Sequence, residues 1–401
     1  MCKTKTRTDA TEPPPSISNR STRRTRPSST STATISSGAT DSARVNSSAT
    51  TSTSASSHSS LASLRSSLPE NPHIYSFSEI SSATNNFLSK PISSSTWRCT
   101  LRSKPSVVVK RRLRRPLDSA QLNHLLSSIS RTHHTSIIKL LGASISGNSI
   151  YLVYDFASGA TLSAALRNPQ NPSFTLLPSW LSRMQIATDL AQGLEYIHHF
   201  SGENIIHNHI KSSAIIVSDP SLNARICHFG ASLLVGEIPD PSSSSTLQKS
   251  NSRVSRVEGT RGYMSPEFIT AGIVSQKSDV FAFGVVILEI FSGEERLKYR
   301  FDEGRSEYER ISLIETVKDA LERAEDGMLR RWMDPRMKDS FPGEVAEKMM
   351  RIALDCVHVE ADKRPDMSQV AGKVSKLYLE SRVWAEQMKS PTGISVSLAP
   401  R

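Results

Sequence analysis

The sequence has 401 residues, with 49 Lys or Arg against 38 Asp or Glu, so its formal net charge is +11. A chain of this length holds two or three domains, or one two-lobed unit with tails. The charge favours acidic partners such as anionic lipid, phosphorylated protein or nucleic acid, without choosing among them. The four cysteines form no CxxC pair, which argues against a disulfide framework and favours a reducing cytosol. No apolar stretch approaches the roughly 20 residues of a membrane-spanning helix, and no secretory leader is recognisable.

Residues 1 to 72 are rich in Ser and Thr, with few carboxylates and few large apolar side chains. Such a segment cannot bury enough apolar surface to fold, so we expect a disordered tail. A chloroplast transit peptide has a similar composition, although Asp9 and Glu12 are atypical of one. Cys2, beside basic residues, leaves open a single palmitoyl group and association with an anionic membrane surface.

The chain becomes apolar and periodic from Tyr75, where we expect the folded region to begin. β-branched runs predict strands at 107–109 and 150–154, with a helix at 118–129 between them. Helical spacing then predicts helices at about 180–200, 277–292, 344–358 and 366–379. Strands early and helices late predict an α+β architecture in two lobes.

Five strings in the second half follow one another in a fixed order. They are IHNHIKSSA at 206–214, CHFG at 227–230, GTRGYMSPE at 259–267, DVFAFG at 279–284 and KRPDM at 363–367. They resemble the catalytic loop, the Asp-Phe-Gly element, the end of the activation segment, the central helix and the late Arg-Pro-x-Met motif of protein kinases. Over roughly residues 75–380 the chain is similar to plant receptor-like kinases and their cytoplasmic relatives.

The resemblance implies a bilobal protein-kinase fold at 73–380, after the tail at 1–72. A β-rich N-lobe would cover about 73–156 and a helical C-lobe about 157–380, with a C-terminal tail at 381–401. It also implies structural roles for Glu267 and Arg364, as an ion pair within the large lobe, and for Asp279, which would brace the catalytic loop.

The phosphate-covering loop of the family is changed here. It should read Gly-x-Gly-x-x-Gly, because only glycine lets the backbone approach the phosphates closely. The matching positions are about Ser89, Pro91 and Ser94, and there is no glycine between Gly38 and Gly142.

The strand lysine that contacts the nucleotide is matched by Lys110, and Val108 matches the small alanine above the adenine. The lysine's partner should be a helix glutamate, but we place Leu125 there, and 119–154 contains no Asp or Glu. The nucleotide-contacting hinge would comprise Tyr154, Asp155 and Phe156.

Three catalytic positions are also replaced, while the catalytic-loop lysine remains as Lys211. His209 stands for the aspartate that orients the substrate hydroxyl, and an imidazole supplies no negative charge. Ala214 stands for an asparagine that binds Mg²⁺, and His228 for the aspartate that does so; Mg²⁺ prefers oxygen ligands. We therefore expect no bound metal and weak or absent ATP binding.

Several alternatives stay open at this point. His207, His209 and His228 would converge on one cleft, which raises a zinc, copper or pH-sensing site against the simpler interpretation of core and filler residues. The basic run at 110–115 is either a localisation or anionic-surface patch or a solvated strand end. The Ser-rich segment between 230 and 265 is either a disordered loop or a phosphorylation target for an active kinase.

These replacements predict a catalytically impaired kinase, a pseudokinase, which acts as a scaffold or allosteric partner in kinase signal transduction. The alternatives are a residually active serine/threonine kinase built on Lys110, Lys211 and His209, and a decaying copy without a selected role. We expect an active kinase or receptor kinase as partner, no nucleic acid, and a cytoplasmic location, with the plasma membrane surface as an option. The partner, the pathway, the lipid state and the phosphorylation state do not follow from the sequence.

Overall fold

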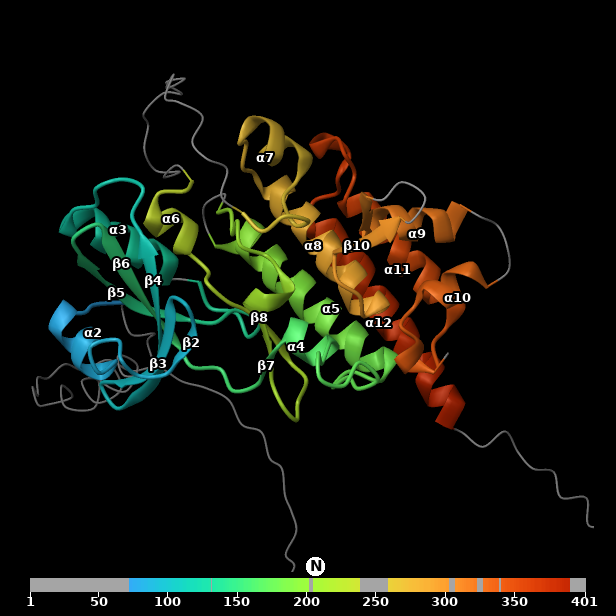
Figure 1. The fold of residues 1–401 in the computed structure, drawn as a ribbon, viewed down its shortest axis with the longest axis horizontal. Helices are drawn as coiled ribbons and strands as arrows, with labels where there is room; N and C mark the ends of the chain where they lie inside the picture. Colours follow the sequence, from blue (N-terminus) through green and yellow to red (C-terminus); the bar gives the residue numbers. More distant parts are fainter. Residues whose placement is uncertain are drawn as a thin grey trace, which may run out of the picture. The chain divides into compact units, whose positions relative to one another are not determined.

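A computed structural model describes residues 72–130, 132–201, 205–238, 259–302, 307–322, 327–338 and 340–389. All of them belong to one compact unit, Leu64–Arg401 (Figure 1). The predicted tail at 1–72 lies almost entirely outside the described residues, and so does most of the Ser-rich segment between 230 and 265.

The small lobe is built on one six-stranded sheet. Its strands, in spatial order, are β1 (His73–Ile74), β5 (Leu140–Ser146), β6 (Ser149–Asp155), β4 (Lys104–Arg112), β3 (Thr96–Leu101) and β2 (Pro91–Ser93). Neighbours pair antiparallel, except that β1 is parallel to β5. The strands predicted at 107–109 and 150–154 are confirmed as parts of β4 and β6.

One helix packs on each face of this sheet, and successive side chains of β4 alternate between the two faces. Val109 joins the main core with Leu125 and Leu126 of α3 (Ser119–Ser130), which confirms the helix predicted at 118–129. Val108 joins a separate cluster with Ile80 of α2 (Phe77–Ala83). The sheet therefore has an α3 face and an α2 face.

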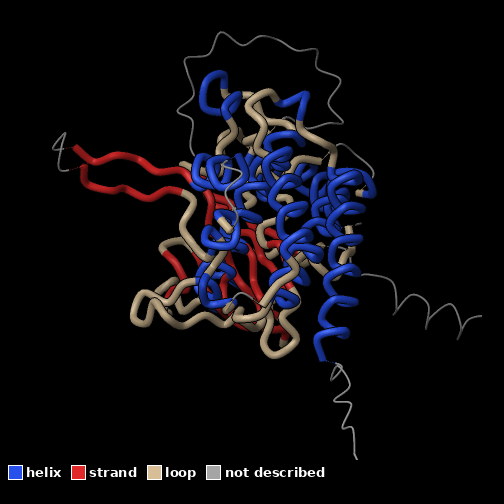
Figure 2. Tube along the Cα trace, turned by 90° about the vertical axis from the view of Figure 1, so that its right-hand side faces the viewer, coloured by secondary structure: helices blue, strands red, loops and turns tan. Residues whose placement is uncertain are grey.

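The large lobe is mostly helical. Its helices are α4 (Leu162–Leu166), α5 (Trp180–Glu195), α6 (Ala231–Val235), α7 (Pro266–Ala271), α8 (Gln276–Ser292), α9 (Leu313–Glu322), α10 (Met328–Trp332), α11 (Gly343–Cys356) and α12 (Met367–Lys389). A small sheet joins β7 (Ala160–Thr161), β8 (Ile215–Val217) and β9 (Ala224–Ile226), and a hairpin joins β10 (Leu297–Asp302) to β11 (Glu307–Ser312) (Figure 2). The predicted α+β architecture is confirmed.

Two predicted helices have different ends. The α-helix expected at 180–200 stops at Glu195, and Tyr196–Phe200 form a π-helical turn. The helix expected at 366–379 continues to Lys389, past the residue where a C-terminal tail was expected to begin. Within the described ranges, no helix is long and apolar enough to cross a membrane.

Helix α8 is the central element of the large lobe. Its residues from Asp279 to Ser292 are all buried and most of them are apolar, as expected of a helix inside a core. It begins where the amide of Ser275 donates to Oγ of Ser278, and it ends at Gly293, whose φ of 71° suits glycine. This start places Asp279 in the first turn, pointing toward the catalytic loop.

The ion pair expected between Glu267 and Arg364 is present. Nη1 and Nη2 of Arg364 each donate to a carboxylate oxygen of Glu267 at 2.8 Å. The guanidinium also donates to the backbone oxygens of Lys277, His358 and Val359, so this fully buried charge is hydrogen-bonded on several sides. It joins α7 to the segment before α12.

Replacing Arg364 with Ala should lower the free energy of unfolding by about 3–5 kcal/mol, because Glu267 loses its partner in a largely buried site. Urea unfolding of the two proteins measures the difference. Arg351→Ala is the matched control, since Arg351 pairs with Glu347 on the exposed surface and should cost at most about 1 kcal/mol. Equal losses for the two variants would contradict the structural role.

The same pair should appear in the acid stability. Burial alone would raise the pKa of Glu267, but the hydrogen bonds and charge of Arg364 outweigh it and lower the pKa from 4.5 to about 2. The unfolded chain then binds more protons than the folded chain between these values, so stability is full above about pH 4.5 and falls toward pH 2. In Glu267→Gln the stability should fall less steeply between pH 5 and 3 than in the unmodified protein, whereas Glu347→Gln should keep the steep fall. Urea midpoints at each pH measure the slope.

Candidate functional site

The carboxylate of Asp279 fixes the predicted catalytic loop. It accepts hydrogen bonds from the backbone amides of His207 and Asn208, each at 2.7 Å, and lies 3.1 Å from Nε2 of His198. Burial alone would raise the pKa of Asp279, but the contacts with His198 and His207 outweigh it and keep the pKa low. The buried group is therefore ionised, and it makes contacts with the catalytic loop of the kind that the family resemblance implied.

His207 is held between two hydrogen bonds. Its Nε2 lies 2.9 Å from the backbone oxygen of Cys227, and its Nδ1 accepts from the amide of His209 at 3.2 Å. Burial lowers its pKa to about 4, so the ring is neutral, with Nε2 donating and Nδ1 accepting. Both ring nitrogens are occupied, which leaves His207 unable to bind a metal ion.

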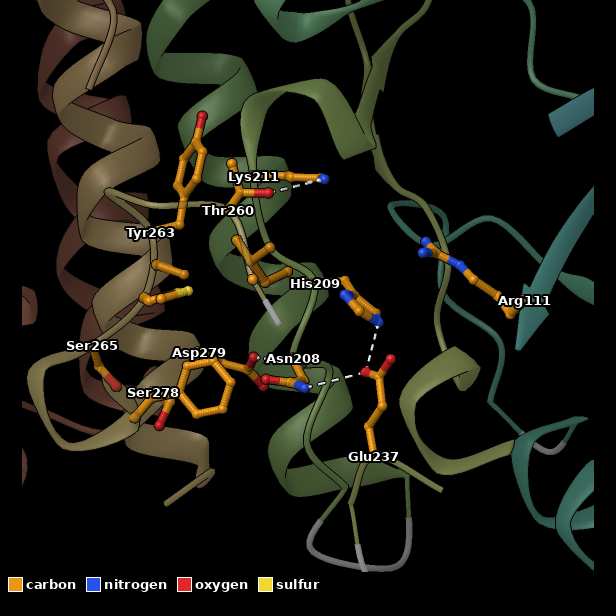
Figure 3. A pocket seen from close by; sticks show the side chains of 15 residues that line it. Arg111, Asn208, His209, Lys211, Glu237, Thr260, Tyr263, Ser265, Ser278 and Asp279 are labelled. Atoms are coloured by element: carbon orange, nitrogen blue, oxygen red, sulfur yellow. Dashed lines mark hydrogen bonds and ion pairs between the residues drawn. The ribbon is translucent and has the colours of Figure 1, made fainter. Parts of the chain in front are cut away.

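His209 makes a contact that the sequence motif does not include. Its Nε2 lies 3.0 Å from Oε2 of Glu237, a residue just after α6. Burial alone would raise the pKa of Glu237, but the hydrogen bond and charge of His209, with Arg114 and Arg111, lower it. The imidazole at the predicted aspartate position therefore carries a carboxylate partner (Figure 3).

The two predicted metal positions offer little to a cation. Ala214 is buried and has no ligand atom. Burial, together with the charge of Arg111, lowers the pKa of His228 well below its ordinary value, and its Nδ1 is buried without a hydrogen-bond partner. Across the described part of the chain, no three His, Cys, Asp or Glu side chains are grouped to hold a metal ion.

The position predicted for Lys110 is wrong. Lys110 is exposed on the α2 face of the sheet, where its Nζ lies 5.8 Å from the centre of the Tyr151 ring. Arg111, on the α3 face, lines the cleft together with His209 and Lys211 (Figure 3). The strand cation of this cleft is therefore Arg111.

The prediction that Val108 lies above the adenine is also wrong, because Val108 is on the same face of β4 as Lys110. Val108 is fully buried on the α2 face, while Val109 faces α3 and packs in the cluster that contains Leu125. Leu125 lies on the buried face of α3, and this face is apolar.

The hairpin expected to cover phosphates is short. β2 and β3 are joined only by Ser94 and Ser95, and Pro91 lies within β2 rather than in the turn. Next to it, the guanidinium of Arg98 lies 4.0 Å from the centre of the Phe156 ring, at the predicted hinge.

The hinge residues are differently placed. Tyr154 is buried and donates from its hydroxyl to the backbone oxygen of Phe229, whereas Asp155 is exposed. The amide of Phe156 donates to the backbone oxygen of Pro105. None of the three lines the cavity described next.

A cavity of about 210 Å³ lies between the catalytic loop and the segment that ends at α7. Polar groups from both sides point into it, as Figure 3 shows; they are Arg111, Asn208, His209, Lys211, Glu237 and Thr260. Nζ of Lys211 donates to Oγ1 of Thr260 at 3.3 Å. Neither Arg111 nor Glu237 could be identified as a site residue from the sequence. Arg111 stands in a run of basic residues, and Glu237 lies outside every motif.

Comparison with known proteins agrees with this geometry. The sequence profile of the family described as protein tyrosine and serine/threonine kinase matches residues 91–374. LysM domain receptor-like kinase 3 of Arabidopsis thaliana is 31% identical over 79% of this chain and 48% of its own length. PTI1-like tyrosine-protein kinase 1 of the same plant is 30% identical over 78% of this chain and 84% of its own length.

Proline-rich receptor-like protein kinase PERK8 of Arabidopsis thaliana is 36% identical over 62% of this chain. The chain spans about a third to a half of the length of this relative and of LysM domain receptor-like kinase 3. The family match covers more than half of the chain and includes the cleft. The chain belongs to the protein tyrosine and serine/threonine kinase family, among the plant receptor-like kinases and their cytoplasmic relatives.

Proposed function

We propose that this protein is a pseudokinase that acts as a scaffold or allosteric partner of an active receptor-like kinase. One observation carries the proposal. The frame of the cleft is intact, with Asp279 bonded to the catalytic loop and Arg364 to Glu267, while Ala214 and His228 stand at the two metal-binding positions. A cleft that keeps its backbone contacts but has lost its metal-binding side chains is better suited to binding a partner protein than to transferring phosphate.

The charges around the cleft also disfavour a divalent cation. Mg²⁺ prefers oxygen ligands, and the carboxylates that line the cavity are Glu237 and Asp279. Both are engaged, the first by His209 and the second by two backbone amides. Arg111 and Lys211 would repel the ion in addition.

A second candidate function is residual phosphate transfer. The contact between His209 and Glu237 favours it, because an imidazole oriented by a carboxylate is a common general base. A base alone does not neutralise the charge that develops on the transferred phosphoryl group, and in this family metal ions do so. We therefore rank this candidate second.

The partner is proposed from the relatives. Their names describe receptor-like kinases, so an active kinase of this broad class is the partner that we propose. Co-purification from the native tissue identifies it, and Arg364→Ala should abolish the interaction because it disrupts the large lobe. Retained binding by an unfolded Arg364→Ala protein would argue against a role for the folded lobes.

Mg²⁺-ATP should not stabilise the protein. A ligand at 100 times its dissociation constant raises the free energy of unfolding by about 2.7 kcal/mol, which a thermal-shift measurement detects. We expect no shift at millimolar Mg²⁺-ATP or Mn²⁺-ATP, because the glycine-rich loop and both metal ligands are replaced.

Phosphate transfer to a general substrate should be equally low for the unmodified protein, Arg111→Met and Lys110→Met. Arg111 lines the cleft and Lys110 does not, so the pair separates an effect of the cleft from an effect of lost surface charge. Robust transfer that disappears in Arg111→Met and persists in Lys110→Met would establish an active enzyme and refute the proposal.

A further inference from the structure

We propose that the cavity between the catalytic loop and residues 259–268 binds, without any metal ion, a phosphate monoester carried on a protein side chain. The inference rests on the proposed function, in which this cleft transfers no phosphate. It adds a ligand class for the partner, namely a segment phosphorylated on serine or threonine.

Two cations face the cavity without a carboxylate partner of their own. Among the described residues the side chain of Arg111 makes no hydrogen bond or ion pair, and its Nε is buried without a partner. Lys211 reaches only the hydroxyl of Thr260. A guanidinium and an ammonium at one cavity match the oxygen atoms of a phosphate, which accept charge-assisted hydrogen bonds from both.

The electrostatics of Lys211 point the same way. Burial lowers its pKa, and the positive charges of Arg111 and Arg296 lower it further. The neighbouring positive charges therefore destabilise the protonated form of Lys211. An anion between Arg111 and Lys211 would relieve that repulsion, so the free energy of the empty site favours anion binding.

The negative groups at the cavity set the limits of this site. Asp279 is turned to the amides of His207 and Asn208, and its charge is compensated there. Glu237 lies 3.0 Å from His209 and opposes an incoming phosphate. Glu237 is therefore the group whose neutralisation should strengthen binding.

The shape of the cavity favours a protein side chain over a nucleotide. Its lining comes from β4, the catalytic loop, Glu237, residues 259–268 and the start of α8, and it includes no hinge residue between 154 and 156. No surface for a purine is therefore part of it. Tyr263, Met264 and Phe268 supply apolar contact for the carbon atoms next to a phosphate, and about 210 Å³ is enough room for both.

The test measures binding of a short alanine peptide with one central phosphoserine, labelled for fluorescence anisotropy, to the full chain in EDTA. The same peptide with unmodified serine should bind at least tenfold more weakly. Arg111→Gln and Lys211→Gln should each weaken binding of the phosphopeptide by about 10- to 100-fold. Lys110→Gln is the matched control, because it removes the neighbouring charge from the opposite face of the sheet and should leave the affinity unchanged.

Glu237→Gln should raise the affinity for the phosphopeptide. A variant that failed to fold would lose affinity, so this result cannot come from unfolding. Melting temperatures of the variants show whether each one folds. Equal affinity for the two peptides, or equal losses in Lys110→Gln and Arg111→Gln, would overturn the proposal.

Competition identifies the source of the phosphate. Inorganic phosphate should displace the peptide only weakly, and ATP without metal should do no better, because the peptide contributes contacts at residues 259–268. Displacement by ATP that requires Mg²⁺ would refute the site as described. Phosphate transfer is assayed separately, so a failed peptide experiment leaves the pseudokinase proposal standing, and detected transfer refutes that proposal by itself.

Discussion

The bonds from Asp279 to the catalytic loop are the contact on which the cleft depends. A buried carboxylate is costly unless its oxygens are satisfied, and here two backbone amides and His198 satisfy them. The bonds hold Asn208 at a φ of 62°, a conformation that a non-glycine residue rarely adopts on its own. Asp279 belongs to the buried helix α8, and its bonds go to backbone amides, so they do not depend on which side chains the loop presents.

The cleft therefore keeps the backbone arrangement of a kinase while its side chains carry different charges. The backbone that would position two aspartates and an asparagine for the substrate and Mg²⁺ instead presents His209, His228 and Ala214, beside Arg111 and Lys211. In active kinases the metal ions mediate between acidic side chains and anionic phosphates. With these residues replaced and the cations kept, the remaining attraction would act on an anion directly, and for this reason we propose that the replacements change which ligand the site favours.

The sequence predicted the large features because they rest on many residues at once. The period of α3, α5, α8 and α11 and the order of five motifs each tolerate local error. The assignment of Lys110 rested on a single position within KRRLRR, and a shift of one residue moves a side chain to the other face of a strand. Only the pairing of β4 with β6, which sets Arg111 opposite Ile150, decides between the two faces. Glu237 could not be found at all, since it approaches His209 through tertiary packing.

That packing links the cleft to the small lobe. α6 leads from Gly230 to Gly236, both at positive φ, and the amide of Arg114 donates to the backbone oxygen of Val235. A Cβ at Gly230 would lie 2.7 Å from a methyl group of Ile129 on α3, so the short helix is closely fitted beneath that element. Glu237 follows directly after α6. A partner that displaced α3 would therefore move α6 and loosen the contact of Glu237 with His209, and removing that carboxylate makes the cavity more positive. This route would couple binding at the small lobe to anion binding in the cleft, which is what the allosteric role that we propose requires.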